Sequence, residues 1–175
     1  MHENMYNGLV PSTGYIVEQL LIDKNNEIPC DYKCYLFGGI CYYVAITSKR
    51  SKTAKKQLFQ STWVDSDFNI ISTPMIKNGY VVNHNLKKPA LFDKMITLTQ
   101  NIATQFKRHC RIDVYIVNDK IYLGEFTFFC GARLHTLLCN FKLGMLWKKN
   151  PDNFKIHDPF ISTIIPDLSF YIKKK

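Results

Sequence analysis

Apolar residues along the chain are spaced mainly as they are in β-strands. Two runs rich in aromatic and β-branched residues, 31–37 and 40–47, flank Gly38-Gly39. Two glycines between such runs predict a hairpin, because both central positions of a type I′ turn need positive φ. An earlier run over 15–21 is mostly apolar, which predicts a short buried strand that leads into a connection.

A change of period marks the second half of the chain. Apolar residues after Pro89 recur at helical spacing, which predicts a helix over about 89–108 packed on a sheet. Two strands are expected to follow, at 111–117 and 121–129, with Asn118-Asp119-Lys120 between them.

Two regions have weaker patterns. Residues 48–88 show little periodicity and support no assignment. The tail over 141–175 contains Gly144 and three prolines, so any helix there is expected to be short or interrupted. The order of hairpin, helix and hairpin predicts an α+β fold with a mainly antiparallel sheet, built as one domain over 1–175.

Composition excludes several classes of protein. With 175 residues, 46% of them hydrophobic and 14% aromatic, the chain can bury enough apolar surface to offset its ordering entropy. The composition therefore excludes disordered, collagen-like, low-complexity and coiled-coil proteins. There is no apolar run of membrane-spanning length, and Met1-His2-Glu3-Asn4 lacks the features of a signal peptide. We expect a soluble, cytoplasmic protein.

Cysteines and net charge narrow the expected ligands. Six cysteines are expected to be free thiols, and without a CxxC pair a structural zinc site is not expected. The net charge of +9 favours an anionic partner, with its densest cluster over 49–56. Nucleic acid is not the expected partner, because no helix-turn-helix, zinc-finger or RNP-type signature accompanies these charges.

Polar residues on the two last predicted strands form a candidate site. Strand alternation places Arg111 with Asp113 on one face, and Glu125 with Thr127 on one face of the neighbouring strand. In an antiparallel pair, opposed residues have numbers with a constant sum. A two-residue loop turns Glu125 away from Asp113, whereas a three-residue loop places Asp113 opposite Glu125 and Arg111 opposite Thr127. Only the second register assembles a site.

The residue types of this site suit nucleotide chemistry. Opposed carboxylates repel each other unless a cation lies between them. Two acids and a hydroxyl suit magnesium, which takes part of its shell from water and substrate phosphates. Arg111 can bind a phosphate oxygen through paired hydrogen bonds. The alternative is that Arg111 pairs with Asp113 or Glu125 on a solvated sheet face, with no metal.

Several blocks of sequence resemble the TupA-like branch of the ATP-grasp superfamily. Their order and spacing agree along about residues 10–147, and the last two blocks together are the most specific. The matching blocks are 16–21 (IVEQLL), 31–33 (DYK), 37–39 (FGG), 111–115 (RIDVY) and 120–128 (KIYLGEFTF).

The resemblance implies nucleotide-binding roles for a hinge segment and for three further residues. Glu18 to Leu21 would form the hinge whose backbone meets adenine. Asp31 would lie near the ribose hydroxyls. Lys33 and Arg50 would be cations beside the phosphates; by its position alone, Lys33 can instead simply pair with Asp31.

The resemblance also implies metal and catalytic roles. Asp113 and Glu125 would be magnesium ligands. Thr127 stands where many ATP-grasp enzymes have Asn, and its hydroxyl would support a metal-bound water. Arg111 would be catalytic by stabilising the transferred γ-phosphoryl group. Residues 130–135 depart from the family pattern, which tends to be richer in proline and glycine.

By this resemblance the protein would bind ATP and Mg²⁺. As an enzyme it would be a ligase of the carboxylate–amine type. It would form an acyl-phosphate on a glycan- or peptide-linked carboxylate in polysaccharide biosynthesis. The matching blocks correspond to the second half of an ATP-grasp domain, so we expect a chain truncated on its N-terminal side. A second polypeptide would then supply the other half. The alternative is a catalytically inactive domain that binds an anionic ligand or a protein partner.

Overall fold

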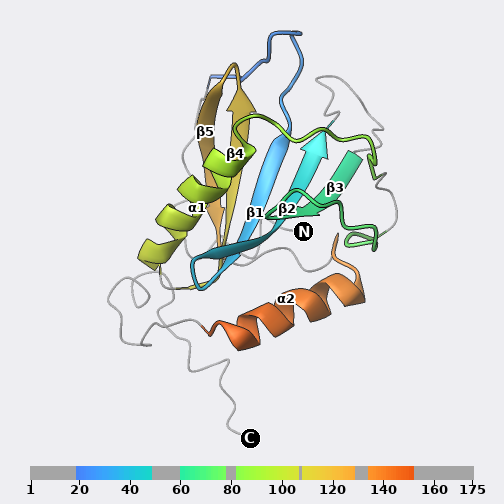
Figure 1. Ribbon diagram of the computed structural model, residues 1–175, viewed down its shortest axis with the longest axis vertical. Coiled ribbons are helices and arrows are strands. Elements are labelled where there is room, and N and C mark those ends of the chain that lie inside the picture. Colours follow the sequence, from blue (N-terminus) through green and yellow to red (C-terminus); the bar gives the residue numbers. More distant parts are fainter. Residues whose placement is uncertain (1–18, 49–59, 78–81, 107, 129–133, 152–175) are drawn as a thin grey trace, which may run out of the picture. The chain divides into compact units, whose positions relative to one another are not determined.

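The computed structural model describes residues 19–48, 60–77, 82–106, 108–128 and 134–151. Contacts group Leu21–Asn153 into one compact unit, which contains every element below. Of the second unit, Met1–Leu20 with Phe154–Lys175, only residues 19 and 20 are described. The elements, labelled in Figure 1, are β1 (Asp31–Phe37), β2 (Ile40–Ser48), β3 (Gln60–Asp65), α1 (Phe92–Phe106), β4 (Cys110–Val117), β5 (Lys120–Thr127) and α2 (Leu137–Lys149).

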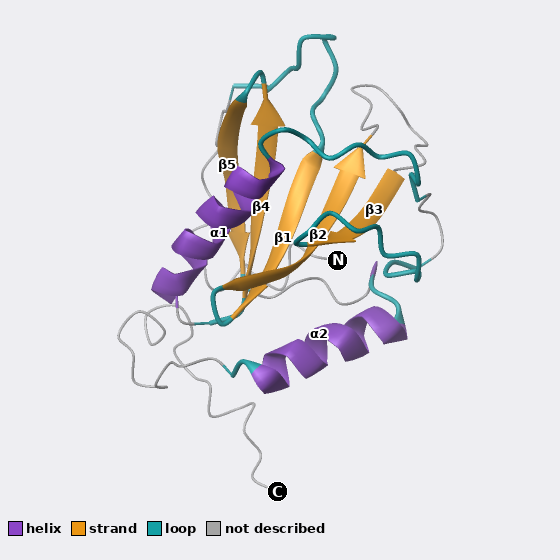
Figure 2. Cartoon of the chain, in the orientation of Figure 1, coloured by secondary structure: helices purple, strands orange, loops and turns teal. Residues whose placement is uncertain are grey.

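The strands form one antiparallel sheet with the order β3-β2-β1-β4-β5. Figure 2 shows this sheet together with the two helices. The predicted α+β class with a mainly antiparallel sheet is therefore confirmed. Strand β1 lies at the centre of the sheet, between β2 and β4, so side chains of β1 can reach both of these strands.

The first hairpin has the predicted form. β1 and β2 are joined by Gly38 and Gly39, whose φ angles are 58° and 82°. Such angles are costly for a residue with a Cβ atom. At Gly39 space is also limited, because an added Cβ would lie 2.9 Å from the Cγ2 atom of Thr104. The turn therefore needs glycine both for its backbone angles and for the close approach of α1.

The predicted helix is confirmed as α1, shorter at both ends than expected. Its apolar stripe packs on one face of the sheet, where every second residue of the strands points. The buried side chains of this core include Phe92, Met95 and Ala103 from α1 and Leu36, Val44, Ile46, Ile112 and Val114 from the sheet. Alternation along the strands thus builds one apolar face for the helix.

The opposite face of the sheet has two different halves. Toward the first hairpin turn it is apolar and packs against α2, through Tyr35, Phe37, Ala45, Trp63 and Cys139. Thr136 caps α2 by accepting a hydrogen bond from the Cys139 amide at 3.1 Å. Toward the start of β1 the same face carries charged residues. Helix α2 therefore covers only part of this face.

Three details differ from what the sequence pattern predicts. No strand forms at 19–21, where the chain is irregular; 15–18 lie outside the described residues. The unassigned region contains β3, whose Ser61 and Thr62 are buried polar residues that break the apolar pattern. In the tail, α2 runs through Gly144 without interruption.

Cysteine state and membrane topology can be stated for the described part of the chain. The five described cysteines, Cys30, Cys34, Cys41, Cys110 and Cys139, are free thiols. Among the described residues, no helix is long and apolar enough to cross a membrane.

Replacing Gly39 by alanine should lower the free energy of unfolding by about 1–2 kcal/mol, because alanine resists positive φ and its Cβ would press on Thr104. The matched control is Gly144→Ala, where an added Cβ meets nothing within 4 Å. In a helix this change should raise stability by about 0.5–1 kcal/mol. Urea denaturation of both variants measures the difference, and equal effects would contradict the assigned turn geometry.

Candidate functional site

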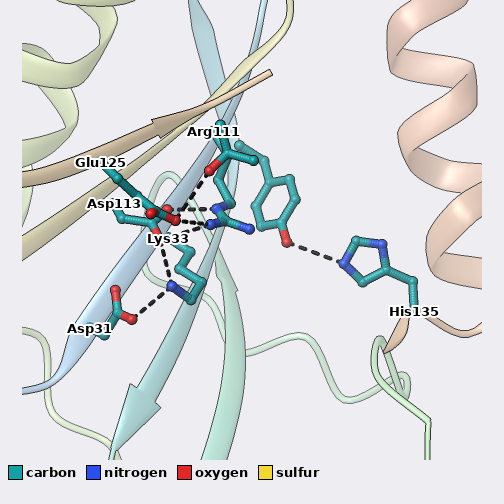
Figure 3. A network of polar contacts seen from close by, with 8 residues as sticks. Asp31, Lys33, Arg111, Asp113, Glu125 and His135 are labelled. Atoms are coloured by element: carbon teal, nitrogen blue, oxygen red, sulfur yellow. Dashed lines mark hydrogen bonds and ion pairs between the residues drawn. The ribbon is translucent and has the colours of Figure 1, made fainter. Parts of the chain in front are cut away.

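Side chains of β1 and β4 form a charged cluster on the sheet face that α2 only partly covers. The Lys33 ammonium lies 2.7 Å from the Asp31 carboxylate and 2.5 Å from the Asp113 carboxylate. Lys33 and Asp113 are paired directly across the two strands. One lysine therefore neutralises two acids from neighbouring strands, as Figure 3 shows.

The Arg111 guanidinium joins β5 to this cluster. Its Nε donates to Asp113 Oδ1 at 2.6 Å, and its Nη2 donates to Asp113 Oδ2 at 2.9 Å. The same Nη2 also donates to Glu125 Oε1 at 2.8 Å. Thr127 completes the group, because its hydroxyl donates to Glu125 Oε1 at 3.3 Å. The two carboxylates thus lie on either side of one cation, as their expected repulsion requires.

The second hairpin starts in the register that was predicted to assemble no site. Val117 pairs with Lys120, so the loop has only two residues, Asn118 and Asp119. Their φ angles are 48° and 59°, as a type I′ turn needs, and Asn and Asp tolerate them. The prediction that a site needs a three-residue loop is therefore wrong.

A bulge in β5 restores the site. Farther from the turn the pairing shifts by one residue, so that Asp113 faces both Gly124 and Glu125. Beyond this point Arg111 pairs with Thr127, as the second register requires. A Cβ at Gly124 would lie 3.0 Å from the Asp113 carbonyl oxygen, so the bulge also favours glycine there. One extra residue thus turns Glu125 toward Arg111.

The cluster is buried on one side and open on the other. Asp31 and Asp113 are buried, whereas 64% of the Glu125 side chain is exposed. Three carboxylates against two cations leave the five charged groups with a net charge of −1. The buried members hold each other in place, and Glu125 is the carboxylate that is open to solvent.

The donor set fits Mg²⁺ in its chemistry, since carboxylate and hydroxyl oxygens are the ligands that this hard cation prefers. Asp113 and Glu125 both accept from Arg111 Nη2, so their oxygens already converge on one cationic position. A divalent ion between them would require the guanidinium to turn aside. In the described residues, no group of three His, Cys, Asp or Glu side chains is arranged to hold a metal. The assignment of Asp113, Glu125 and Thr127 as metal ligands stays a prediction.

The remaining predicted residues lie apart from this cluster or cannot be placed. Leu21 is half-buried in an irregular segment that precedes β1. Glu18 and Arg50 lie outside the described residues. The structure therefore brings together six of the nine predicted site residues: Asp31, Lys33, Arg111, Asp113, Glu125 and Thr127.

An aromatic and histidine group on the same sheet face was not predicted. Tyr35 follows Lys33 by two residues, and its hydroxyl lies 3.2 Å from His135 Nε2. Trp63 packs against both rings. Burial lowers the pKa of His135, and the Arg111 charge acts in the same direction, against a contact with Asn140 that raises it. Strand alternation could have placed Tyr35 here, but no local signal brings His135 to β1.

Comparison with known proteins identifies the class of protein that this fold and site define. The charged cluster lies on the Arg-x-Asp strand and the Glu-x-Thr strand that resemble an ATP-grasp domain. A family model described as TupA-like ATPgrasp matches residues 2–138. The match covers well over half of the chain, which therefore belongs to the TupA-like ATP-grasp family. No curated protein and no solved structure matched the chain in the same comparisons.

Lys33→Met should destabilise the protein strongly, because it removes the charge that Asp31 and Asp113 share. We expect the free energy of unfolding to fall by about 3 kcal/mol, as is typical when one partner of a buried ion pair is lost. Lys94→Met, which removes a lysine from the exposed side of α1, is the matched control. A loss below about 1 kcal/mol for Lys33→Met in urea denaturation would show that the buried acids do not depend on this lysine.

Stability should fall as the pH drops below about 6.5, partly through His135. Its folded pKa lies below the unfolded value, so the unfolded chain takes up the proton first and gains stability as the solution becomes acidic. Through His135, the free energy of unfolding falls by at most about 1.4 kcal/mol per pH unit. His135→Gln should flatten the profile between pH 7 and 5, measured by urea denaturation. The exposed His84→Gln is the control, and equal slopes for the wild type and His135→Gln would contradict the assignment.

Proposed function

We propose that the protein binds Mg-ATP and acts as an ATP-grasp ligase that activates a carboxylate. The observation that carries this proposal is the position of Arg111, whose guanidinium lies between the carboxylates of Asp113 and Glu125. Membership of the TupA-like ATP-grasp family supports the same conclusion.

In this proposal the nucleotide contacts follow the family pattern. The backbone from Glu18 to Leu21 would meet adenine, and Asp31 would lie near the ribose hydroxyls. Lys33 and Arg50 are the cations beside the phosphates. Lys33 pairs with Asp31 and Asp113 in the structure, which supports a role for its ammonium close to the proposed metal ligand Asp113.

The residues of β4 and β5 act on the transferred phosphoryl group. Asp113 and Glu125 would hold Mg²⁺, with Thr127 supporting a water of its shell. The ion would neutralise the negative charge of the phosphates. Arg111 would turn from the two carboxylates to the γ-phosphate, where its paired donors match the oxygens of a phosphoryl group. Its charge is then placed where negative charge develops.

The reaction class is carboxylate activation. A carboxylate oxygen of the acceptor attacks the γ-phosphorus, the bond to the β-phosphate oxygen breaks, and ADP leaves. An amine then attacks the acyl-phosphate and releases inorganic phosphate. The proposed acceptor is a carboxylate on a glycan or glycopeptide precursor, and the use of ATP would place the reaction in the cytoplasm. In this proposal a second polypeptide would close the site over the nucleotide.

A second candidate is a catalytically inactive ATP-grasp-like domain that binds an anionic ligand or a protein partner. It is favoured by the fact that both oxygens of Asp113 accept hydrogen bonds from this chain's own cations. Acceptor-dependent release of ADP by the chain alone would exclude it. ADP release only after addition of a second polypeptide would indicate a split enzyme.

Titration calorimetry with ATP and Mg²⁺ tests the proposal directly. The wild-type protein should bind the nucleotide in the presence of Mg²⁺. Asp113→Ala and Glu125→Gln should each weaken binding about tenfold or more, because each removes one carboxylate from the proposed metal site. Glu125→Gln is the safer variant for folding, since this side chain is exposed.

Asp119→Asn is the matched control for these variants. It removes one acid from the turn of the same hairpin, at a position where asparagine also tolerates the positive φ. Its affinity for Mg-ATP should equal that of the wild type. The proposal is wrong if the folded wild type does not bind Mg-ATP, or if Asp113→Ala and Glu125→Gln bind it as well as Asp119→Asn does.

A further inference from the structure

Helix α2 is apolar on two sides, although only one side packs on the sheet. On the inner side, Cys139, Leu143 and Leu146 contact the core beneath the first hairpin. On the outer side, four large apolar residues are exposed, and Phe141 has 66% of its surface in solvent. We call these four the outer stripe: Leu137, Leu138, Phe141 and Met145. Their spacing places them on one side of the helix.

The charges beside this stripe are all positive. Lys142, Lys148 and Lys149 lie on α2, and the helix contains no acidic residue. The last two also suit the negative end of the helix dipole, but that explanation does not cover Lys142 or the exposed apolar residues. Apolar and cationic side chains on one side of a helix fit a partner that is both apolar and anionic.

The surface around the stripe is shallow. An open hollow of about 600 Å³ runs between β2 and α2, with Tyr43, Phe141, Met145 and Leu146 among its lining residues. The three lysines also line this hollow. Exposed Leu and Phe side chains together with lysines are a feature of helices that lie in the interface of a lipid bilayer.

The geometry points to an anionic phospholipid bilayer as the partner of this surface. We propose that α2 lies along the bilayer, with the outer stripe inserted between headgroups and the three lysines against lipid phosphates. Lysine side chains are long enough to keep the ammonium at the headgroups while their methylenes cover apolar surface. A protein partner would have to place an acidic residue opposite each of the three lysines, whereas an anionic bilayer presents negative headgroups over its whole surface.

This surface is separate from the proposed nucleotide site. The family match ends at residue 138, so Phe141, Met145 and the three lysines lie beyond it. The charged cluster is built from β1, β4 and β5, and α2 contributes no residue to it. Membrane binding and nucleotide binding can therefore be tested independently.

Sedimentation with vesicles tests the proposal on the full chain without nucleotide. We expect the protein to bind vesicles of phosphatidylcholine that contain about one-third phosphatidylserine. Binding to vesicles of phosphatidylcholine alone should be much weaker. Replacing all three α2 lysines by glutamine should lower the partition coefficient about a hundredfold. The double variant Phe141→Gln, Met145→Gln should lower it at least about tenfold.

Two matched controls separate the surface from general charge and hydrophobicity. Lys24, Lys94 and Lys120 are exposed lysines off α2, and changing them to glutamine removes the same charge. Leu98→Gln with Leu123→Gln removes two exposed apolar residues elsewhere. Both controls should bind vesicles as the wild type does.

The proposal is overturned if the wild type does not bind anionic vesicles, if it binds neutral vesicles equally well, or if the controls lose as much binding as the α2 variants. Sedimentation velocity gives a further check, because a dimer that Phe141→Gln dissociates would assign the stripe to a second copy of the chain instead. Circular dichroism confirms that each variant keeps its secondary structure. Loss of Mg-ATP binding by Glu125→Gln with vesicle binding retained would show that the two surfaces act separately.

Discussion

A carboxylate buried in a sheet needs positive charge beside it, and much of the candidate site follows from meeting this need at Asp113. Lys33 reaches it from β1, and Arg111 reaches it from β4, the strand that also carries Asp113. Because each cation also contacts a second acid, the pairing spreads to Asp31 on one side and Glu125 on the other. Three neighbouring strands are therefore tied together by charge as well as by their backbone hydrogen bonds.

Local sequence signals predict the parts of the fold that depend on local chemistry. Gly38-Gly39 marks the first turn because few other residues accept its backbone angles, and apolar spacing locates α1. The face shared by Arg111 and Asp113 follows from alternation alone, whereas Lys33 joins them only through the pairing of β1 with β4. The bulge at Gly124 does not follow from alternation, because it depends on how many residues face each other across two strands.

Other features were missed for different physical reasons. Strand β3 contains Ser61 and Thr62, which are buried without being apolar, so it lacks the pattern of a strand. His135 is brought to Tyr35 by the path of the chain over 100 residues, which no local pattern encodes. Helix α2 has apolar residues on both sides, so its spacing does not indicate which side packs on the sheet.

The bulge in β5 makes the site depend on the register of a strand as well as on its side chains. With the same residues and the same two-residue turn but a regular ladder in place of the bulge, Glu125 would pair with Ile112 and point to the other face of the sheet, away from Arg111. Replacing the charged side chains one at a time leaves that register unchanged and cannot reveal it. Relatives with the same acids and the same number of residues between turn and acid, but with no bulge, would carry the motif without the geometry.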